Sequence, residues 1–349
     1  MRKELLILFL LLPIACQKET ISVCDSEKKL RDVADFRVGT TFDQFRGSLY
    51  LYGEVVGEHF NRISSENALK MDRTVLSYSE FDFFPYASLS REGKFNKLQA
   101  IHIHPVIWHK QVPKWLPDLP ADSLESFLKN YCTKFREYLG YTDLLVVDGI
   151  DVVNEALNED GSMRQSFWYQ AMGKDFLTLA YKEFSKLDPA IKLFYNDYNL
   201  ESNPVKLDAA LDLCDWLREQ GVRVDGIGMQ MHITIHEPSI SDMAAAVQKI
   251  IDRGYMIHFS ELDISLNPYG KYDTATPELL NKQAERYYEV FRLYQEIPKD
   301  LQYGITVWGL ADPYSWIPDT YARFDAPLIL GESFEPKPAY CSCLNALEK

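Results

Sequence analysis

The chain has 349 residues, with 51 acidic and 37 basic side chains and a formal net charge of −14. This balance argues against nucleic acid as a partner, because phosphate neutralisation needs a basic face, and it gives no support to electrostatic membrane binding. Hydrophobic residues make up 46% and charged residues 25%, which is ordinary for a globular protein with a large core. The length suits one or two domains, and α/β barrels of this length are often a single domain.

The N-terminus has the pattern of a secretory signal peptide. Met1–Lys3 is basic, and the apolar run Leu5–Leu12 is too short for a stable transmembrane span. The following Pro13-Ile-Ala-Cys16 resembles a bacterial lipobox, in which the cysteine is lipidated after cleavage, although Pro13 stands where leucine is usual. Ordinary signal cleavage is the alternative. We expect a signal peptide over 1–16 with lipidation at Cys16, a polar tether over 17–30 and a catalytic domain over 31–349. We predict that the protein is exported and is anchored as a lipoprotein at the bacterial cell surface or in the periplasm.

Cysteine usage agrees with export but predicts no metal site. If Cys16 is lipidated, five cysteines remain, and an odd number leaves at least one free thiol. Two of them lie on apolar faces of predicted helices, where a buried free thiol is expected. The five are Cys24, Cys132, Cys214, Cys341 and Cys343, of which Cys132 and Cys214 are the helical pair.

Short apolar runs alternate with amphipathic stretches at helical spacing along the rest of the chain. The eight candidate strands are Phe36–Thr41, Phe60–Ile63, Ala100–Trp108, Leu144–Asn154, Ile191–Tyr195, Val224–His232, Tyr255–Glu261 and Tyr303–Trp308. The clearest helical stretches are 124–139, 176–184, 207–217, 243–251 and 280–294, with a closing helix over Pro338–Leu347. The stretch Tyr86–Lys97 is the weakest helix, since it contains Gly93 and lacks a clean apolar stripe.

Eight strands alternating with helices predict a parallel sheet closed as a single-domain α/β fold, the (β/α)8 TIM barrel. A doubly wound open sheet is the alternative, and it is disfavoured because no Gly-rich phosphate loop follows an early strand. In a barrel the active site lies at the C-terminal ends of the strands. Polar and aromatic groups follow seven of the eight predicted strands, among them Asn154 and Glu155 after the fourth and Glu261 in the seventh.

Two strands that end on glutamates suggest paired-carboxylate chemistry. Cleavage of a glycosidic bond needs one carboxylic acid to protonate the leaving oxygen and a second carboxylate near the anomeric carbon. Glu155 and Glu261 lie on the fourth and seventh strands, which face each other across a barrel mouth. His232, from the sixth strand, is placed to bond the nucleophile, and Asp263 could orient His232. Asn154 could bond a sugar 2-hydroxyl.

The motifs together resemble family 10 glycoside hydrolases, the endo-β-1,4-xylanases. Asp151-Val-Val-Asn-Glu155, Gln230-Met-His232 and Glu261-Leu-Asp263 are similar to the acid/base, support and nucleophile motifs of that family. Five further segments match in chain order. They are Phe60–Lys70, His104–Trp115, Asn196–Asn199, Trp308–Trp316 and Lys337–Tyr340. The sequence departs from the family's usual residues at Ile103, Ser260 and Ala311.

The resemblance implies a retaining endo-β-1,4-xylanase with Glu155 as general acid/base and Glu261 as nucleophile. It implies xylan or xylo-oligosaccharides as substrate, and we expect a monomer with no cofactor and no metal ion. The residues it places near the scissile bond are Glu66, Asn67, Lys70, His104, Trp108, Gln111, Asn154, Gln230, Trp308 and Trp316, with Tyr198 on the downstream side.

Other interpretations remain open for single residues. Asp263 could be only a helix N-cap or loop acid. Trp308 and Trp316 could be ordinary core. Glu66 and Lys70 share one helical face if the segment is helical, so they could simply pair.

Three other functions also remain open. His102-Ile-His104 could hold a metal, as in a metal-dependent amidohydrolase, although His258 is expected to point away if Glu261 points in. A β-1,4-glucanase of related barrel type would use the same chemistry. A surface lipoprotein that binds polysaccharide without cutting it would not need both glutamates.

Overall fold

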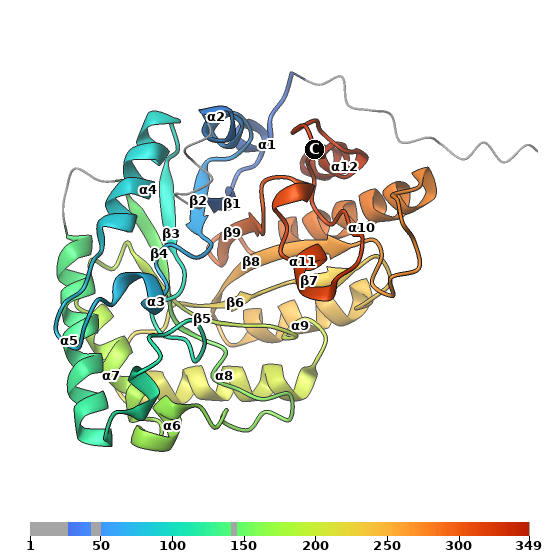
Figure 1. Cartoon of the computed structure of the whole chain (residues 1–349). Helices are drawn as coiled ribbons and strands as arrows, with labels where there is room; N and C mark the ends of the chain where they lie inside the picture. The colour runs from blue at the N-terminus through green and yellow to red at the C-terminus, as the bar shows by residue number, and fades with distance from the viewer. Residues whose placement is uncertain (1–26, 43–49, 141–144, 349) are drawn as a thin grey trace, which may run out of the picture.

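The computed structural model describes residues 27–42, 50–140 and 145–348. A parallel sheet curls into a barrel at its centre, and helices cover its outside (Figure 1). The strands of the described residues are β1 Arg37–Phe42, β2 Arg62–Ser65, β3 Ala100–Ile103, β4 Val147–Asn154, β5 Lys192–Asp197, β6 Gly226–Met229, β7 His232–Thr234, β8 Met256–Ser265 and β9 Gln302–Val307.

The sheet closes on itself, as the alternation of strands and helices predicts. Its order is β6-β5-β4-β3-β2-β1-β9-β8-β7, and a parallel β6–β8 pairing completes the ring. The short strand β7 follows β6 after a break and pairs with the C-terminal part of β8. Eight strand positions therefore form the barrel, and the predicted single-domain (β/α)8 TIM barrel is confirmed.

Helices connect successive strands, and each helix predicted from apolar spacing is present. The helices are α1 Leu30–Val33, α2 Tyr50–His59, α3 Met71–Thr74, α4 Phe84–Phe95, α5 Ala121–Leu139, α6 Phe167–Met172, α7 Asp175–Phe184, α8 Pro204–Glu219, α9 Ile240–Asp252, α10 Pro277–Gln295, α11 Ile317–Tyr321 and α12 Pro338–Leu347. The weakly predicted second helix is α4. Tight packing explains the glycine at position 93 of this helix, since a Cβ there would lie 2.6 Å from Leu145 Cδ2.

Two predicted strands, the third and the sixth, are interrupted before their predicted C-terminal ends. The third strand stops at Ile103 rather than at Trp108, because Pro105 has no N–H to donate and interrupts the ladder, which Ile107 resumes as an isolated parallel bridge to Val153. The predicted sixth strand is interrupted between β6 and β7, where Met231 adopts a left-handed φ of 61°. Both interruptions lie at the C-terminal end of the barrel. Side chains there do not have to alternate between the inside and the outside of the barrel as they do in a regular strand.

The cysteines follow the sequence expectation where they are described. Cys132 and Cys214 are free and buried, as is Cys343, whereas Cys341 is disulfide-bonded. Within the described ranges, no helix is both long and apolar enough to cross a membrane. The predicted signal peptide, the lipidation at Cys16 and most of the tether fall outside those ranges and stay predictions.

Candidate active site

A cleft of about 710 Å³ opens at the C-terminal ends of the strands. Of the side chains predicted from the sequence to bind sugar or perform catalysis, every one lines this cleft except Asp263, which lies directly behind it. The lining residues from that set are Glu66, Asn67, Lys70, His104, Trp108, Gln111, Asn154, Glu155, Tyr198, Gln230, His232, Glu261, Trp308 and Trp316. Residues from the ends of every strand from β2 to β9 thus converge on one cavity.

Glu261 is held inside β8 by an irregularity of that strand. The register of the β8–β9 pairing shifts between Phe259 and Leu262, which is a β-bulge-like break. Two adjacent side chains therefore face the interior. Ser260 Oγ donates to Asn196 Oδ1 at 2.6 Å, and Asn196 Nδ2 donates to Glu261 Oε1 at 2.7 Å. A regular strand would send one of these two neighbours outward.

The other carboxylate oxygen of Glu261 faces His232. His232 Nε2 lies 3.3 Å from Glu261 Oε2, and His232 Nδ1 lies 2.9 Å from Asp263 Oδ2. Burial by itself lowers the pKa of His232, but the Asp263 and Glu261 carboxylates hold this pKa well above its ordinary value. Asp263 thus has the geometry predicted for orienting His232. The helix-cap alternative is wrong, because Asp263 lies within β8 and also accepts from Trp316 Nε1 at 2.8 Å.

Glu261 is ionised in this setting. Burial raises the pKa of its carboxyl, but His104, His232 and Asn196 together bring this pKa below the ordinary value. His104 Nε2 lies 3.8 Å from Glu261 Oε1. A buried carboxylate surrounded by imidazoles and an amide donor is kept as an anion, which is the form that a nucleophile requires.

Glu155 is presented by a left-handed turn immediately after β4. Its φ is 55°, a conformation that non-glycine residues rarely adopt, and such strain concentrates at functional sites. The turn is held by backbone bonds, since Glu155 N donates to Asn196 O at 2.9 Å and Arg164 Nε donates to Glu155 O at 2.9 Å. The side chain is only 8% exposed and lines the cleft.

A network of amide side chains joins the two glutamates. Gln230 Nε2 lies 3.3 Å from Glu155 Oε1 and 3.4 Å from Asn154 Oδ1. Asn154 Oδ1 also accepts from Asn196 Nδ2 at 2.9 Å, and Asn196 reaches Glu261. The carboxylates on β8 and after β4 therefore share one hydrogen-bonded frame, so their relative position is set by packed and bonded groups.

Lys70 forms the opposite wall with two amide side chains. Its Nζ donates to Asn67 Oδ1 at 3.0 Å and to Gln111 Oε1 at 2.7 Å, and it lies 4.9 Å from the centre of the Trp108 ring. The alternative in which Glu66 and Lys70 share a helical face is wrong, because residues 66–70 form bends and turns and α3 begins at Met71. Burial lowers the pKa of Lys70.

The model of Glycosyl hydrolase family 10 matches residues 29–346. The chain belongs to this family. An endo-1,4-beta-xylanase of Geobacillus stearothermophilus is 32% identical over 340 residues, which cover 93% of this chain and all of that protein.

Other members are similar over most of the chain. The protein named Exoglucanase XynX of Acetivibrio thermocellus is 33% identical over 318 residues, covering 87% of this chain and 28% of its own length. The crystal structure of xylanase 10B from Thermotoga petrophila in complex with xylobiose superposes with a TM-score of 0.85 at 27% identity, covering 92% of this chain and 98% of that one. An intracellular xylanase of Thermoanaerobacterium saccharolyticum gives a TM-score of 0.83 at 30% identity, covering 92% and 100%.

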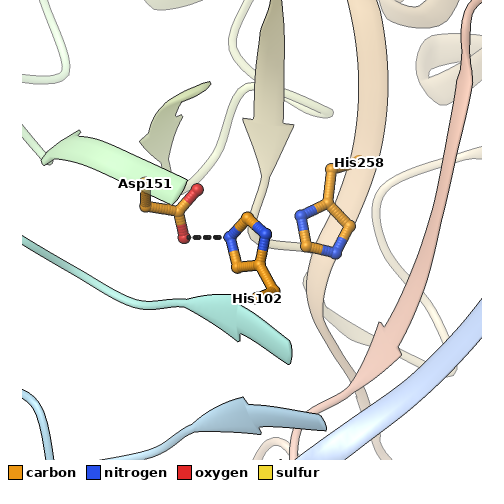
Figure 2. A group of neighbouring side chains, drawn as sticks. All are labelled: His102, Asp151 and His258. Carbon is orange, nitrogen blue, oxygen red and sulfur yellow. Dashed lines mark ion pairs between the residues drawn. The ribbon is translucent and has the colours of Figure 1, made fainter. Parts of the chain in front are cut away.

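This family 10 hydrolase also contains a buried histidine cluster below the cleft (Figure 2). His102 and His258 lie beside Asp151, with His102 Nε2 3.1 Å from Asp151 Oδ2. The prediction that His258 points away from Glu261's side is wrong. His258 is fully buried in the barrel interior, 4.7 Å from the His102 ring, because the break in β8 after Phe259 puts both His258 and Glu261 inside.

The donor set of this cluster does not fit a divalent cation. Arg62 Nη2 lies 3.0 Å from His258 Nε2, and since a guanidinium can only donate, His258 Nε2 must accept. Burial and the Arg62 charge lower the pKa of His258 well below its ordinary value, so the ring is neutral and its proton is on Nδ1. Neither nitrogen is then free to bind a metal.

Asp151 acts instead as a support for His104. His104 Nδ1 lies 2.8 Å from Asp151 Oδ2. Burial raises the pKa of Asp151, but His102 and His104 outweigh it and bring the pKa to about 2. An ionised Asp151 fixes the ring that faces Glu261 on one side and lies edge-on to Trp308, 5.0 Å away, on the other.

Sequence reasoning missed several residues of the family 10 site. Asn196 was recognised only as part of a motif, although it bonds Glu261, Asn154 and Ser260. Arg164 was not recognised at all, and its Nη2 donates to Tyr198 Oη at 3.0 Å. Further residues complete the lining of the cleft, namely Lys110, Asn199, Thr320 and Tyr321. The match of Asn196–Asn199 to a family motif was the signal available for Asn196, although it assigned no role to that residue.

Proposed function

We propose that the protein is a retaining endo-β-1,4-xylanase in which Glu261 is the nucleophile and Glu155 the general acid/base. The observation that carries this proposal is the contrast between the two glutamates. Glu261 is an anion with a lowered pKa in a cradle of imidazole and amide groups, whereas Glu155 is joined to neutral amides. Two carboxyl groups in different environments are what acid and nucleophile roles require.

The reaction then proceeds in two displacements. Glu155 donates a proton to the glycosidic oxygen while that bond to the anomeric carbon breaks, and Glu261 forms an ester with the same carbon. In the second step Glu155 removes a proton from water, and the resulting hydroxide displaces the Glu261 carboxylate. Each displacement inverts the anomeric centre, so the net outcome is retention.

The position of the leaving sugar follows from these roles. Tyr198 lies on the acid/base side, since Arg164 bonds both its hydroxyl and the Glu155 carbonyl. We place the leaving sugar there and the transferred sugar between Lys70, His104 and Trp308. This arrangement would offer donors to hydroxyls on one side and an aromatic face on the other.

Xylan is the favoured substrate because most of the similar proteins are named as endo-1,4-beta-xylanases. A β-1,4-glucanase is the second candidate, since one relative of comparable identity is named an exoglucanase. Product profiling on decorated xylans and on cellulose separates the two. Export and lipid anchoring at Cys16 remain a proposal based on the N-terminal sequence.

The decisive experiment measures reducing-sugar release from xylan by the pure protein and then by two variants. Glu261→Ala should abolish hydrolysis, and azide should partly restore turnover of an activated aryl xyloside with an α-configured product. Glu155→Ala should still form the glycosyl-enzyme from the activated substrate, and azide should then give the β-configured product.

Each other outcome would contradict a stated part of the proposal. Exchanged product configurations would reverse the two roles. Xylan binding without sugar release would replace the enzyme by a polysaccharide-binding protein. Loss of activity with a chelator would restore the metal-dependent alternative.

A further inference from the structure

His102 lies beneath the catalytic cleft and has no role in the proposed reaction. Its Nε2 is 3.1 Å from Asp151 Oδ2, the same oxygen that lies 2.8 Å from His104 Nδ1. His104 Nε2 in turn lies 3.8 Å from Glu261 Oε1. Figure 2 shows the His102 ring between Asp151 and His258. One buried carboxylate oxygen therefore joins His102 to the ring that faces the proposed nucleophile.

The other nitrogen of the His102 ring faces a tyrosine hydroxyl that already donates its proton elsewhere. His102 Nδ1 lies 2.9 Å from Tyr303 Oη, and Tyr303 Oη donates to Asp148 Oδ1 at 2.7 Å. Burial and the Asp148 carboxylate raise the pKa of Tyr303 well above its ordinary value, so the hydroxyl keeps its proton. A hydroxyl has only one proton to donate, so toward His102 this oxygen must accept. The Nδ1 atom of His102 therefore carries a proton.

The Nε2 atom of His102 must carry a proton as well. Burial raises the pKa of Asp151, but the two neighbouring imidazoles outweigh it and bring this pKa to about 2, so the carboxyl is ionised. An unprotonated Nε2 would direct its lone pair at a carboxylate oxygen 3.1 Å away, which is repulsive. Within the described part of the chain, no hydrogen-bond donor faces Nε2 instead. With a proton on each nitrogen, His102 is an imidazolium.

The charges around the ring balance when His102 is a cation. The neighbouring titratable side chains, from β1 to β9, are Arg37, Arg62, His104, Asp148, Asp151, His258 and Tyr303, and β5 contributes the apolar Phe194 ring. Arg62 Nη1 lies 3.6 Å from Asp148 Oδ2, and Arg62 Nη2 donates to the neutral His258 ring at 3.0 Å. Arg62 and His102 then face the carboxylates of Asp148 and Asp151, so neither carboxylate lacks a cation.

A glycine leaves the space that the His102–Tyr303 contact needs. A Cβ at Gly149 would lie 2.2 Å from Tyr303 Oη and 3.0 Å from His102 Nδ1. A side chain of any size at this position would therefore separate the hydroxyl from the imidazole. Gly149 follows Asp148 on β4, so the strand that supplies the carboxylate for Tyr303 also makes room for the tyrosine.

We propose that His102, as an imidazolium, is a positioning residue for the proposed nucleophile and acts through Asp151 and His104. Asp151 Oδ1 makes no hydrogen bond within the described ranges, so the two imidazoles at Oδ2 are what orients this carboxylate. The positive ring also compensates the charge of Asp151. Without that compensation the Asp151 anion would raise the pKa of Glu261, because one anion disfavours another nearby. The role of His102 rests on the proposed function, to which it adds one residue.

Nitrogen-15 NMR of the wild-type protein tests the charge on His102 directly. The chain has seven histidines, so labelling at histidine gives few signals. Signals that are missing from His102→Gln, or displaced in Tyr303→Phe, identify the ring. At pH 7 both nitrogens of this ring should have the chemical shifts of an imidazolium. An unprotonated nitrogen in His102 at this pH would overturn the proposal, and the measurement needs no activity, so it is independent of the proposed function.

The pH dependence of kcat/KM on an aryl xylobioside tests the effect on the nucleophile. His102→Gln is neutral, so it should lower kcat/KM by about 10-fold and move the acidic limb to higher pH by at least about half a unit. Tyr303→Phe should move the limb less and in the same direction. Tyr255→Phe is the matched control, because Tyr255 is also buried and donates to an aspartate, Asp215, at 2.6 Å outside the cluster. This variant should leave the limb where it is.

Two kinetic outcomes would overturn the role of His102. A lower kcat/KM with an unmoved acidic limb would show that the ring serves only the structure, and an equal shift in Tyr255→Phe would show that the effect is not specific to the cluster. The double variant of His102→Gln and Tyr303→Phe should move the limb no further than His102→Gln alone, since both changes act on one charge. Additive shifts would contradict action through a single imidazolium.

Discussion

At the scale of single residues, Asn196 has the largest role that the sequence motifs left unassigned. It is fully buried, and its amide group bonds Glu261, Asn154 and Ser260 at once. The Ser260 hydroxyl fixes the direction of the amide, because it donates to Oδ1 and leaves Nδ2 for the carboxylate. Asn196 is therefore a positioning residue for the proposed nucleophile and stabilises its anionic form.

Replacement of Asn196 should lower catalysis without preventing folding. Asn196→Ala removes a hydrogen bond to a charged group, worth about 1.5–3 kcal/mol, so kcat/KM on an aryl xylobioside should fall about 10- to 150-fold. Asn196→Asp should be worse, since a second carboxylate beside Glu261 raises the pKa of the nucleophile. Ser260→Ala keeps the amide and should cost less than either change. Steady-state kinetics over pH 4 to 9 measures all three, and an Asn196→Ala variant with wild-type kinetics would contradict this role.

At the scale of elements, the segment that carries Trp308 and Trp316 is tied to α12 by a buried ion pair. Lys337 Nζ lies 2.9 Å from Asp312 Oδ2 and donates to Ala326 O at 2.8 Å. Burial lowers the pKa of Lys337 and raises that of Asp312, and the attraction between the two charges offsets part of each shift. Two motifs that lie far apart in the sequence thus meet in one contact.

Breaking this pair on one side should destabilise the protein strongly. Lys337→Met leaves Asp312 as a buried unpaired charge and should lower the free energy of unfolding by about 3–5 kcal/mol. The double variant with Asp312→Asn should recover most of that loss, since no charge remains unpaired. Urea denaturation of both single variants and the double variant measures the coupling. Additive losses would show that the two side chains do not stabilise each other.

The strands, helices and turns also show which parts of the fold could be predicted from the sequence and which could not. Apolar periodicity located all eight barrel strands and seven of the helices, because burial on a closed sheet demands that pattern, but it did not locate α2 Tyr50–His59 or the short helices α1, α3, α6 and α11. It gave His258 the wrong side, since a register break in β8 cannot be read from alternation. It likewise did not foresee the left-handed turns at Gln111, Glu155 and Met231. These conformations depend on contacts between distant segments, such as the Glu155 N–H with the Asn196 carbonyl.

At the scale of the whole molecule, the acidic side chains that give the net charge of −14 include Glu201, which the fold buries at a cost in stability. Glu201, in the loop after β5, is 2% exposed, and its Oε2 has no hydrogen-bond partner within the described part of the chain. Burial raises its pKa from 4.5 to about 7. Because the folded-state pKa lies above the unfolded value, the stability linked to the protonated form is fully present below about pH 4.5 and is lost as pH rises to about 7.

Glu201→Gln should therefore stabilise the protein at neutral and alkaline pH and have little effect at pH 4.5. The amide cannot ionise, so at pH 8 the variant should exceed the wild type by on the order of 3 kcal/mol in the free energy of unfolding, at about 1.4 kcal/mol per pKa unit. At pH 4.5 the advantage should be small, since most of Glu201 is then protonated in the folded protein. Urea unfolding curves at the two pH values give the comparison, with Glu219→Gln, an exposed glutamate at the end of α8, as the control. A gain of equal size at both pH values would show that the amide improves packing and that ionisation of Glu201 does not limit stability.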